Sequence, residues 1–172
     1  MWNRQPSIYT MNSKFVNIAS GTITMSIMAA AITIGMLGQP QVDSEQQHCM
    51  AMNIYHESRS EVIEGQIAVA HVTANRVNHE NWPNNICDVV YQNKQFSWTF
   101  LVQDKTPTNK KMWDQALVIA RDVMIGNTVD PTNGAVFYHA NYVNPTWASK
   151  KQLSVSKVIG VHIFYTWTGT WD

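Results

Sequence analysis

Apolar residues recur at helical spacing in three stretches of the chain after residue 43. The spacing predicts amphipathic helices over residues 44–55, 63–77 and 109–125, because side chains three and four positions apart share one helix face. Asp43 or Ser44 can cap the first helix, since both side chains accept hydrogen bonds from free backbone N–H groups. These stretches predict a largely helical core.

Late in the chain the pattern changes from helical spacing to β-branched and aromatic residues. Residues 135–139 predict one strand and residues 157–167 its hairpin partner, with residues 140–156 as a long polar loop between them. The turn at 130–134 precedes the first strand, and Gly126 or Asn127 can end the helix before it. Helices followed by a small late β-hairpin indicate an α+β domain.

The N-terminal part of the chain has a different character. Residues 15–38 contain no charged side chain, and this run exceeds the roughly 20 residues that cross a bilayer. Arg4 and Lys14 precede it and no acidic residue occurs before Asp43, which predicts a cytoplasmic N-terminus and an external domain. We therefore expect a signal-anchor helix within residues 1–42; a cleaved secretory signal is the alternative.

Overall charge excludes one class of partner. The 12 basic residues balance the 12 acidic residues, and no basic stripe with interleaved aromatic side chains is present. Electrostatic binding to a phosphate backbone requires such a stripe. We expect no nucleic-acid partner, and we expect residues 43–172 to form one external domain.

Carboxylates crowd at the junction of the first two helices. Glu57 and Glu61 flank Arg59, and Glu64 follows one turn later. A carboxyl group that enters a cleft loses hydration, so its pKa rises and it can act as a general acid near neutral pH. From spacing alone, solvated helix ends with an exposed ion pair explain the same residues.

Further blocks follow one another along the chain. They are the segments 53–61, 64–70, 75–77, 82–83, 87–92, 95–98 and 134–138, followed by the closing Ile-Gly-x-His-x-Phe at 159–164. In content and order these blocks resemble the catalytic domain of SleB-type cell wall hydrolases, the family of the spore cortex-lytic enzymes. The family resemblance extends over about residues 47–167. The apolar N-terminal run, which lies outside this range, is similar to the releasable signal-anchors of some phage endolysins.

The resemblance implies a lysozyme-like fold and a lytic transglycosylase that cleaves the MurNAc–GlcNAc β-1,4 bond of peptidoglycan. Glu57 occupies the position of the catalytic acid, and Arg59 and Glu61 are expected to orient its loop. One glutamate is enough for such an enzyme, whereas a hydrolytic muramidase needs a second carboxylate, for which Glu61 is the nearest candidate. The sequence is also compatible with an N-acetylmuramoyl-L-alanine amidase or with a membrane-anchored protein that binds peptidoglycan without cutting it.

Further candidates for the substrate site come from the polar and aromatic blocks. Gln95 and Ser97 lie in a Gln-Phe-Ser-Trp segment that combines ring surface with hydrogen-bonding groups, as sugar sites do. Tyr138 at the end of a strand is expected to contact the sugar or hold Glu57. His162 is expected to be a hydrogen-bonded structural residue or a substrate contact.

The chain contains two cysteines and six histidines. Cys49 and Cys87 predict one disulfide in an exported domain, with two buried free thiols as the alternative. The sequence lacks the second histidine of a helical zinc motif, so we expect neither a metal nor another cofactor. We also expect a monomer whose catalytic domain faces the cell wall space, with the protein either anchored in the inner membrane or exported.

Overall fold

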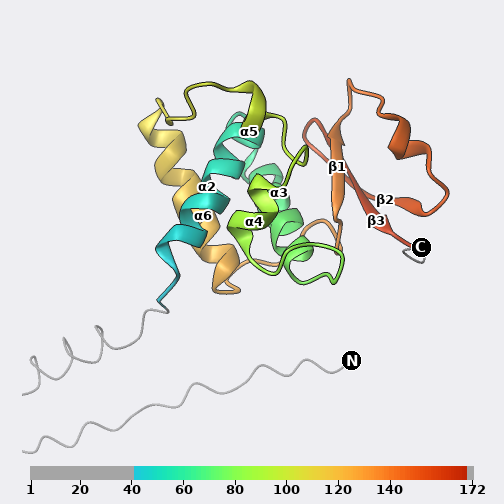
Figure 1. Ribbon diagram of the computed structural model, residues 1–172, viewed down its shortest axis with the longest axis horizontal. Helices are drawn as coiled ribbons and strands as arrows, with labels where there is room; N and C mark the ends of the chain where they lie inside the picture. Colours follow the sequence, from blue (N-terminus) through green and yellow to red (C-terminus); the bar gives the residue numbers. More distant parts are fainter. Residues whose placement is uncertain (1–40, 170–172) are drawn as a thin grey trace, which may run out of the picture. The chain divides into compact units, whose positions relative to one another are not determined.

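The computed structural model describes residues 41–169, which belong to the unit Pro40–Asp172. The predicted signal-anchor at 15–38 lies outside the described residues. Within residues 41–169, no helix is both long enough and apolar enough to cross a membrane. The described part is an α+β domain with helices on one side and a three-stranded antiparallel sheet on the other (Figure 1).

Three long helices build the helical side, as the spacing predicts. They are α2 (Ser44–Ser58), α3 (Ile63–Val77) and α6 (Lys110–Met124). The carboxylate of Asp43 accepts hydrogen bonds from the N–H groups of Glu45 and Gln46, so Asp43 is the N-cap of α2. The helix continues to Ser58, three residues beyond the predicted end, and Glu57 therefore lies in its last turn.

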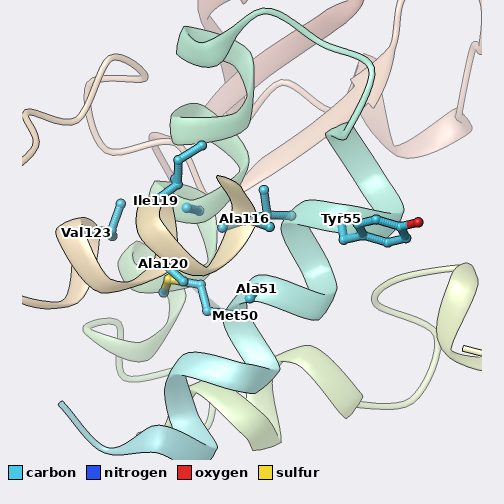
Figure 2. Close-up of a cluster of buried hydrophobic side chains, with 9 residues drawn as sticks. Met50, Ala51, Tyr55, Ala116, Ile119, Ala120 and Val123 are labelled. Atoms are coloured by element: carbon cyan, nitrogen blue, oxygen red, sulfur yellow. The ribbon is translucent and has the colours of Figure 1, made fainter. Parts of the chain in front are cut away.

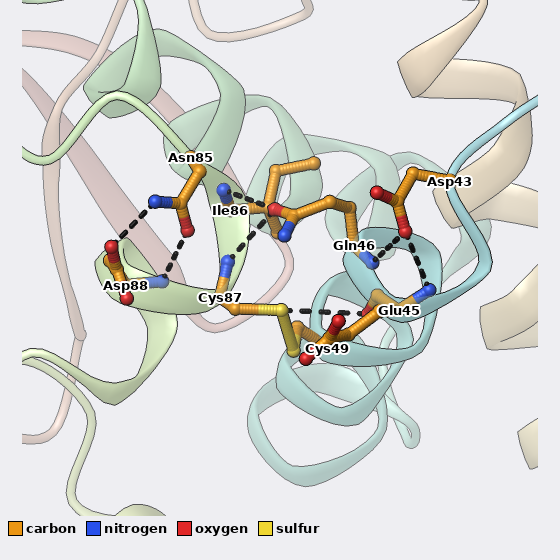
Figure 3. The surroundings of a disulfide bond; sticks show 8 residues. All are labelled: Asp43, Glu45, Gln46, Cys49, Asn85, Ile86, Cys87 and Asp88. Carbon is orange, nitrogen blue, oxygen red and sulfur yellow. Dashed lines mark hydrogen bonds between the residues drawn. A yellow bond between two sulfur atoms is a disulfide. The ribbon is translucent and has the colours of Figure 1, made fainter.

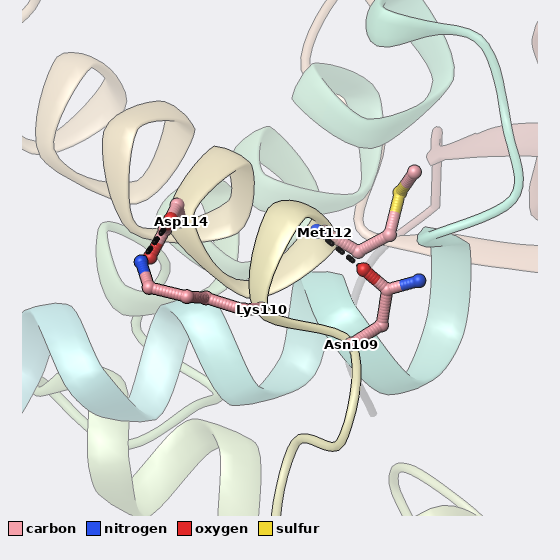
Figure 4. Close-up of polar contacts among 4 residues, drawn as sticks. All are labelled: Asn109, Lys110, Met112 and Asp114. Atoms are coloured by element: carbon pink, nitrogen blue, oxygen red, sulfur yellow. Dashed lines mark hydrogen bonds and ion pairs between the residues drawn. The ribbon is translucent and has the colours of Figure 1, made fainter.

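Helix α6 has clear signals at both ends. The side-chain oxygen of Asn109 accepts a hydrogen bond from the N–H of Met112 at 3.1 Å, which satisfies a donor of the first turn (Figure 4). Lys110 and Asp114 form an exposed ion pair one turn apart, which adds little stability. Gly126 ends the helix with a φ of +74°, a conformation that favours glycine.

The main core lies where α2, α3 and α6 meet. Figure 2 shows small alanines of α2 and α6 beside larger apolar side chains, which lets the helix backbones approach closely. The buried members of this cluster are Met50, Ala51, Ile54, Tyr55, Ala70, Ala116, Ile119, Ala120 and Val123. This packing fixes α2, whose C-terminal turn carries Glu57.

Two short helices were not predicted. Residues expected to be irregular form α4 (Ile86–Tyr91) and α5 (Trp98–Leu101). They are too short to show helical periodicity, and α4 depends on its cap, in which the Asn85 side chain accepts from the N–H of Asp88 at 2.9 Å.

The predicted disulfide joins Cys49 of α2 to Cys87 of α4 (Figure 3). The side chain of Gln46 supports the same contact by accepting hydrogen bonds from the N–H groups of Ile86 and Cys87. The bond restricts the unfolded chain and so favours the folded state. It holds α4 against α2, and the prediction of a disulfide is confirmed.

The sheet differs from the predicted hairpin. It contains β1 (Phe137–Ala140), β2 (Leu153–Ile159) and β3 (His162–Trp167) in the order β1-β3-β2. The predicted strand 157–167 is broken by a turn at Gly160, whose φ is +57°. The predicted loop 140–156 also contains a 3-10 helix, Thr146–Ser149, and the start of β2.

One face of the sheet packs on α3. Ala68 and Val72 of the helix lie against Ile159 and Phe164 of the sheet, and all four side chains are buried. This second cluster joins the sheet to the helical side. The edge of β1 is thereby brought beside the C-terminal turn of α2.

Candidate active site

A cleft of about 400 Å³ lies between the helical side and the sheet. Five parts of the chain contribute to its walls, namely the end of α2, the end of α3, the segment 95–98, β1 with the loop after it, and the start of β3. The site residues among its lining are His56, Glu57, Arg76, Gln95, Ser97, Tyr138 and His162. The fold therefore brings together residues that are up to about a hundred positions apart in sequence.

Glu57 enters this cleft from the last turn of α2. Its carboxylate oxygen Oε2 accepts a hydrogen bond of 3.0 Å from the hydroxyl of Tyr138. Burial raises the pKa of Glu57 above its ordinary value of 4.5, while the Tyr138 hydrogen bond and the charge of Arg76 partly oppose the rise. A carboxyl group in this setting can hold a proton for transfer to a bound substrate.

Tyr138 comes from β1 and reaches Glu57 across the cleft. Burial and the neighbouring Glu57 raise the pKa of Tyr138 well above 10, so the phenol keeps its proton and remains a hydrogen-bond donor. Its ring lies edge-on to the ring of His162, with centroids 5.2 Å apart. The hydrogen bond to Glu57 is compatible with the expected support of this residue by Tyr138, and the role itself stays a prediction.

Arg76 lies in the last turns of α3, and only 4% of its surface is exposed. Its Nε donates a 2.8 Å hydrogen bond to the carbonyl of Val136, and its guanidinium lies 5.1 Å from the centroid of the Phe96 ring. Burial lowers the pKa of Arg76 to about 10, although Tyr138 and Glu57 oppose the shift. Arg76 remains a cation at neutral pH.

His162 of β3 is a buried member of the same wall. Burial lowers the pKa of His162, and the charge of Glu61 partly opposes this change. Within residues 41–169 its Nδ1 atom has no hydrogen-bond partner. The ring packs against Tyr138 and is neutral at neutral pH.

Gln95 and Ser97 are exposed residues in the lining of the cleft. Beside them His56 stacks on Trp98, with ring centroids 4.5 Å apart. The indole N–H of Trp98 donates to the buried side chain of Asn53 at 2.9 Å, which fixes the ring. The lining of the cleft thus combines exposed polar groups with a fixed pair of stacked rings, a mixture that sugar-binding sites also use.

Arg59 and Glu61 do not line the cleft. The exposed Arg59 guanidinium lies over the ring of Tyr55, 4.9 Å from its centroid, in a neighbouring groove. The Oε2 atom of Glu61 accepts a hydrogen bond of 3.1 Å from the N–H of Val161 in the β2–β3 turn. Glu61 therefore connects the start of α3 to the sheet.

The histidines do not assemble a metal site in the part of the chain that the structure describes. No group of three or more histidine, cysteine or acidic side chains lies close enough to hold an ion there. His139 instead bonds through Nε2 to the Tyr165 hydroxyl at 2.8 Å, and His56 bonds through Nε2 to the Lys105 carbonyl at 3.0 Å.

The sequence interpretation missed Arg76 as a member of the site. A signal was present, because Ala68, Val72 and Arg76 recur every four residues and so share the face of α3 that meets the sheet. A charge on an otherwise apolar stripe must be desolvated, which marks it as unusual. His56 and Trp98 gave no such signal, since their stacking depends on the tertiary fold.

Comparison with known proteins agrees with this architecture. Residues 60–165 match the Cell Wall Hydrolase family. The spore cortex-lytic enzyme of Bacillus cereus is 34% identical over 118 residues, which is 67% of this chain and 42% of that protein. The enzyme of Bacillus subtilis is 29% identical over 120 residues, or 67% of this chain and 35% of the relative. The chain spans about two fifths or less of the length of these relatives.

Solved structures show the same fold. The catalytic domain of the Bacillus cereus SleB protein is 28% identical, with a TM-score of 0.57, and the match covers 76% of this chain and 99% of that domain. The catalytic domain of the germination-specific lytic transglycosylase SleB from Bacillus anthracis matches equally well over 75% of this chain and 100% of its own. The chain belongs to the Cell Wall Hydrolase family, and its described domain has the SleB-type catalytic fold.

Proposed function

We propose that this protein degrades peptidoglycan by cleaving the MurNAc–GlcNAc β-1,4 bond as a lytic transglycosylase, with Glu57 as the catalytic residue. One observation carries the proposal. Among the described residues, Glu57 is the one carboxylic acid that lines the cleft, and it is both desolvated and hydrogen-bonded to Tyr138. The names of the relatives, a spore cortex-lytic enzyme and a lytic transglycosylase, support the same chemistry.

The reaction requires one carboxyl group that works twice. Protonated Glu57 gives its proton to the glycosidic oxygen, the bond from that oxygen to C1 of MurNAc breaks, and positive charge develops on the sugar ring. The Glu57 carboxylate then accepts the proton of the C6 hydroxyl while O6 bonds to C1. The product is a 1,6-anhydro sugar, and Glu57 is again protonated.

The position of Glu61 favours this pathway over hydrolysis. A hydrolytic muramidase needs a second carboxylate that faces the first across the bond to be cleaved. Glu61 is the nearest candidate in sequence, but its carboxylate bonds to the N–H of Val161 and lies outside the lining of the cleft. We assign Glu61 to the support of the β2–β3 turn.

Substrate contacts come from the walls around Glu57. Gln95 and Ser97 present exposed polar groups to the cleft, and His162 supports the ring of Tyr138. Arg59 lies in the adjoining groove, which shares His56 and Trp98 with the cleft. We propose that Gln95 and Ser97 hydrogen-bond to sugar hydroxyl or acetamido groups and that Arg59 holds the end of α2 through Tyr55.

We also propose that the protein acts as a monomer on the cell wall side of a membrane. Residues 15–38 would form the signal-anchor and residues 43–172 the external domain. The disulfide supports this location, because such bonds persist in oxidising compartments. A tag added to the C-terminus should be digested by protease applied outside intact spheroplasts, and its protection would contradict the proposed orientation.

The activity is tested by adding the purified full-length chain to a turbid suspension of cell walls. The wild-type protein should clear the suspension, whereas Glu57→Gln should fold normally and lose activity by at least about a hundredfold, because the amide cannot give a proton. Glu80→Gln is the matched control, since it removes an exposed carboxylate in the 78–85 loop, and it should clear walls at the wild-type rate. Wild-type turnover by Glu57→Gln would remove Glu57 from its proposed role.

A further inference from the structure

Arg76 is buried in the wall of the cleft that Glu57 also lines, and the family assignment gives it no role. Its Nη1 atom is buried and has no hydrogen-bond partner within residues 41–169. The ion pairs found in the same residues, Lys110 with Asp114 and Arg121 with Asp122, do not include Arg76. A desolvated cation with no ion-pair partner is costly, so its presence in the wall of the cleft points to a functional use.

The guanidinium is held rigidly rather than left free to seek a partner. Val136 accepts its Nε hydrogen bond, and the rings of Phe96 and Trp82 lie 5.1 and 5.8 Å from its central carbon. These contacts orient the positive charge toward the cleft that Glu57 and Tyr138 also line. A fixed charge in a site of low dielectric acts strongly on a neighbouring acid without reorganising.

We propose that Arg76 is a positioning residue for the proton of Glu57: its buried guanidinium stabilises the carboxylate that Glu57 becomes after it protonates the departing oxygen. This inference rests on the proposed function. Burial alone would make Glu57 a weak acid that keeps its proton, while the charge of Arg76 favours release. The two influences together let one carboxyl group give a proton and take it back.

Other titratable groups also face Glu57, and the test must separate them from Arg76. Titratable groups that line the same cleft include Tyr138 and His139 from β1, His56 from the helix of Glu57 and His162 from β3, and His139 bonds to the Tyr165 hydroxyl. Burial lowers the pKa of His56 and of His162, so neither supplies a positive charge at neutral pH. All four remain unchanged when only Arg76 is replaced.

The test compares the wild-type full-length chain with Arg76→Met and with Lys111→Met, which removes one positive charge from the exposed face of α6. Because the active form of Glu57 is protonated, the rate falls as pH rises through the pKa of Glu57. This fall is the alkaline limb of the pH–rate profile. We expect Arg76→Met to move the alkaline limb to higher pH by roughly one pH unit and to lower kcat about three- to tenfold. Lys111→Met should leave the limb in place.

A titration that needs no substrate gives a second measurement. The carboxyl carbon of Glu57, assigned by its loss in Glu57→Gln, should titrate at higher pH in Arg76→Met than in the wild type when followed by 13C NMR. Arg76→Lys keeps a cation, so its alkaline limb should lie at least halfway back from the Arg76→Met position to the wild-type position. If Arg76→Met does not fold, Arg76→Gln replaces it, since its amide can still donate to the Val136 carbonyl.

An unchanged limb and an unchanged Glu57 titration in a folded uncharged variant would overturn the inference. Failure of the proposed function gives a different result. In that case the wild-type protein releases no glycan product, while the NMR comparison still reports whether Arg76 acts on Glu57. A purely structural role for Arg76 would lower the melting temperature without moving either titration.

Discussion

At the scale of single residues, opposing influences act on the pKa of Glu57. The carboxyl group leaves a buried helix for a cleft in which the loss of water opposes its negative charge. Tyr138 and Arg76 act in the other direction, the first by a hydrogen bond and the second by its charge. An acid poised between these effects suits proton transfer in both directions.

The raised pKa of Glu57 has a measurable consequence for stability. The pKa of Glu57 is raised in the folded protein above its ordinary value of 4.5, so above that pH the folded state binds more protons than the unfolded chain. Glu57 therefore destabilises the fold increasingly as pH rises from 4.5 to its folded pKa. Glu57→Gln should raise the melting temperature at neutral pH, and the gain should vanish as pH falls below about 4.5.

The melting temperatures of both proteins across pH check this prediction. Glu80→Gln again serves as the control, because its exposed carboxylate should contribute no comparable gain. A gain for Glu57→Gln that is equal at acid and neutral pH would contradict the linkage, since removal of the acid would then act through packing alone.

At the scale of elements, the turn between β2 and β3 is built around Glu61. Gly160 has a φ of +57°, and a Cβ placed there would clash with Oε2 of Glu61. The same oxygen accepts the hydrogen bond from Val161. The glycine thus allows both the turn and the approach of α3 to the sheet.

We expect Gly160→Ala to destabilise the protein more than Gly126→Ala. Gly126 also has a positive φ, +74°, but nothing lies within 4 Å of its added Cβ, so it should show only the backbone cost of about 1–2 kcal/mol. Urea unfolding of both variants measures the difference. In a Gly160→Ala, Glu61→Ala double variant the cost should be less than the sum, and strict additivity would contradict the contact.

The long helices could be predicted from sequence because each carries its own signals. Apolar spacing and the predicted cap at Asp43 act locally, and the Asp43 cap is present in the structure. The short helices α4 and α5 and the strand β2 could not be predicted in the same way. The disulfide and Gln46 hold α4, the hydrogen bond from Trp98 to Asn53 holds α5, and pairing with β3 holds β2. All of these are contacts between distant segments.

The same distinction applies to the site. Glu57, Tyr138, Gln95, Ser97 and His162 were predicted through resemblance to a family, and the fold places all five around one cleft. Their catalytic and binding roles stay predictions. Arg76 was missed although its place on the apolar stripe of α3 marks it as unusual, because that signal does not tell which acid a buried cation will face.

At the scale of the whole molecule, the described domain is a helical body joined to a small sheet (Figure 1). The cleft is lined by residues from both parts. This arrangement brings an acid from a helix to a hydroxyl from a strand. Family membership and the SleB-type fold agree with the arrangement. We predict that one carboxyl group, Glu57, performs the whole reaction.

Mass spectrometry of the muropeptides released from purified peptidoglycan by the full-length chain tests this claim most directly. We expect glycan products that are one water lighter than the hydrolytic ones and that lack a reducing end. Products with reducing ends would contradict the single-glutamate mechanism, because water would then be the nucleophile and a second carboxylate would be needed. Freed peptides with intact glycan would contradict it more completely, since the bond that is cleaved would be an amide.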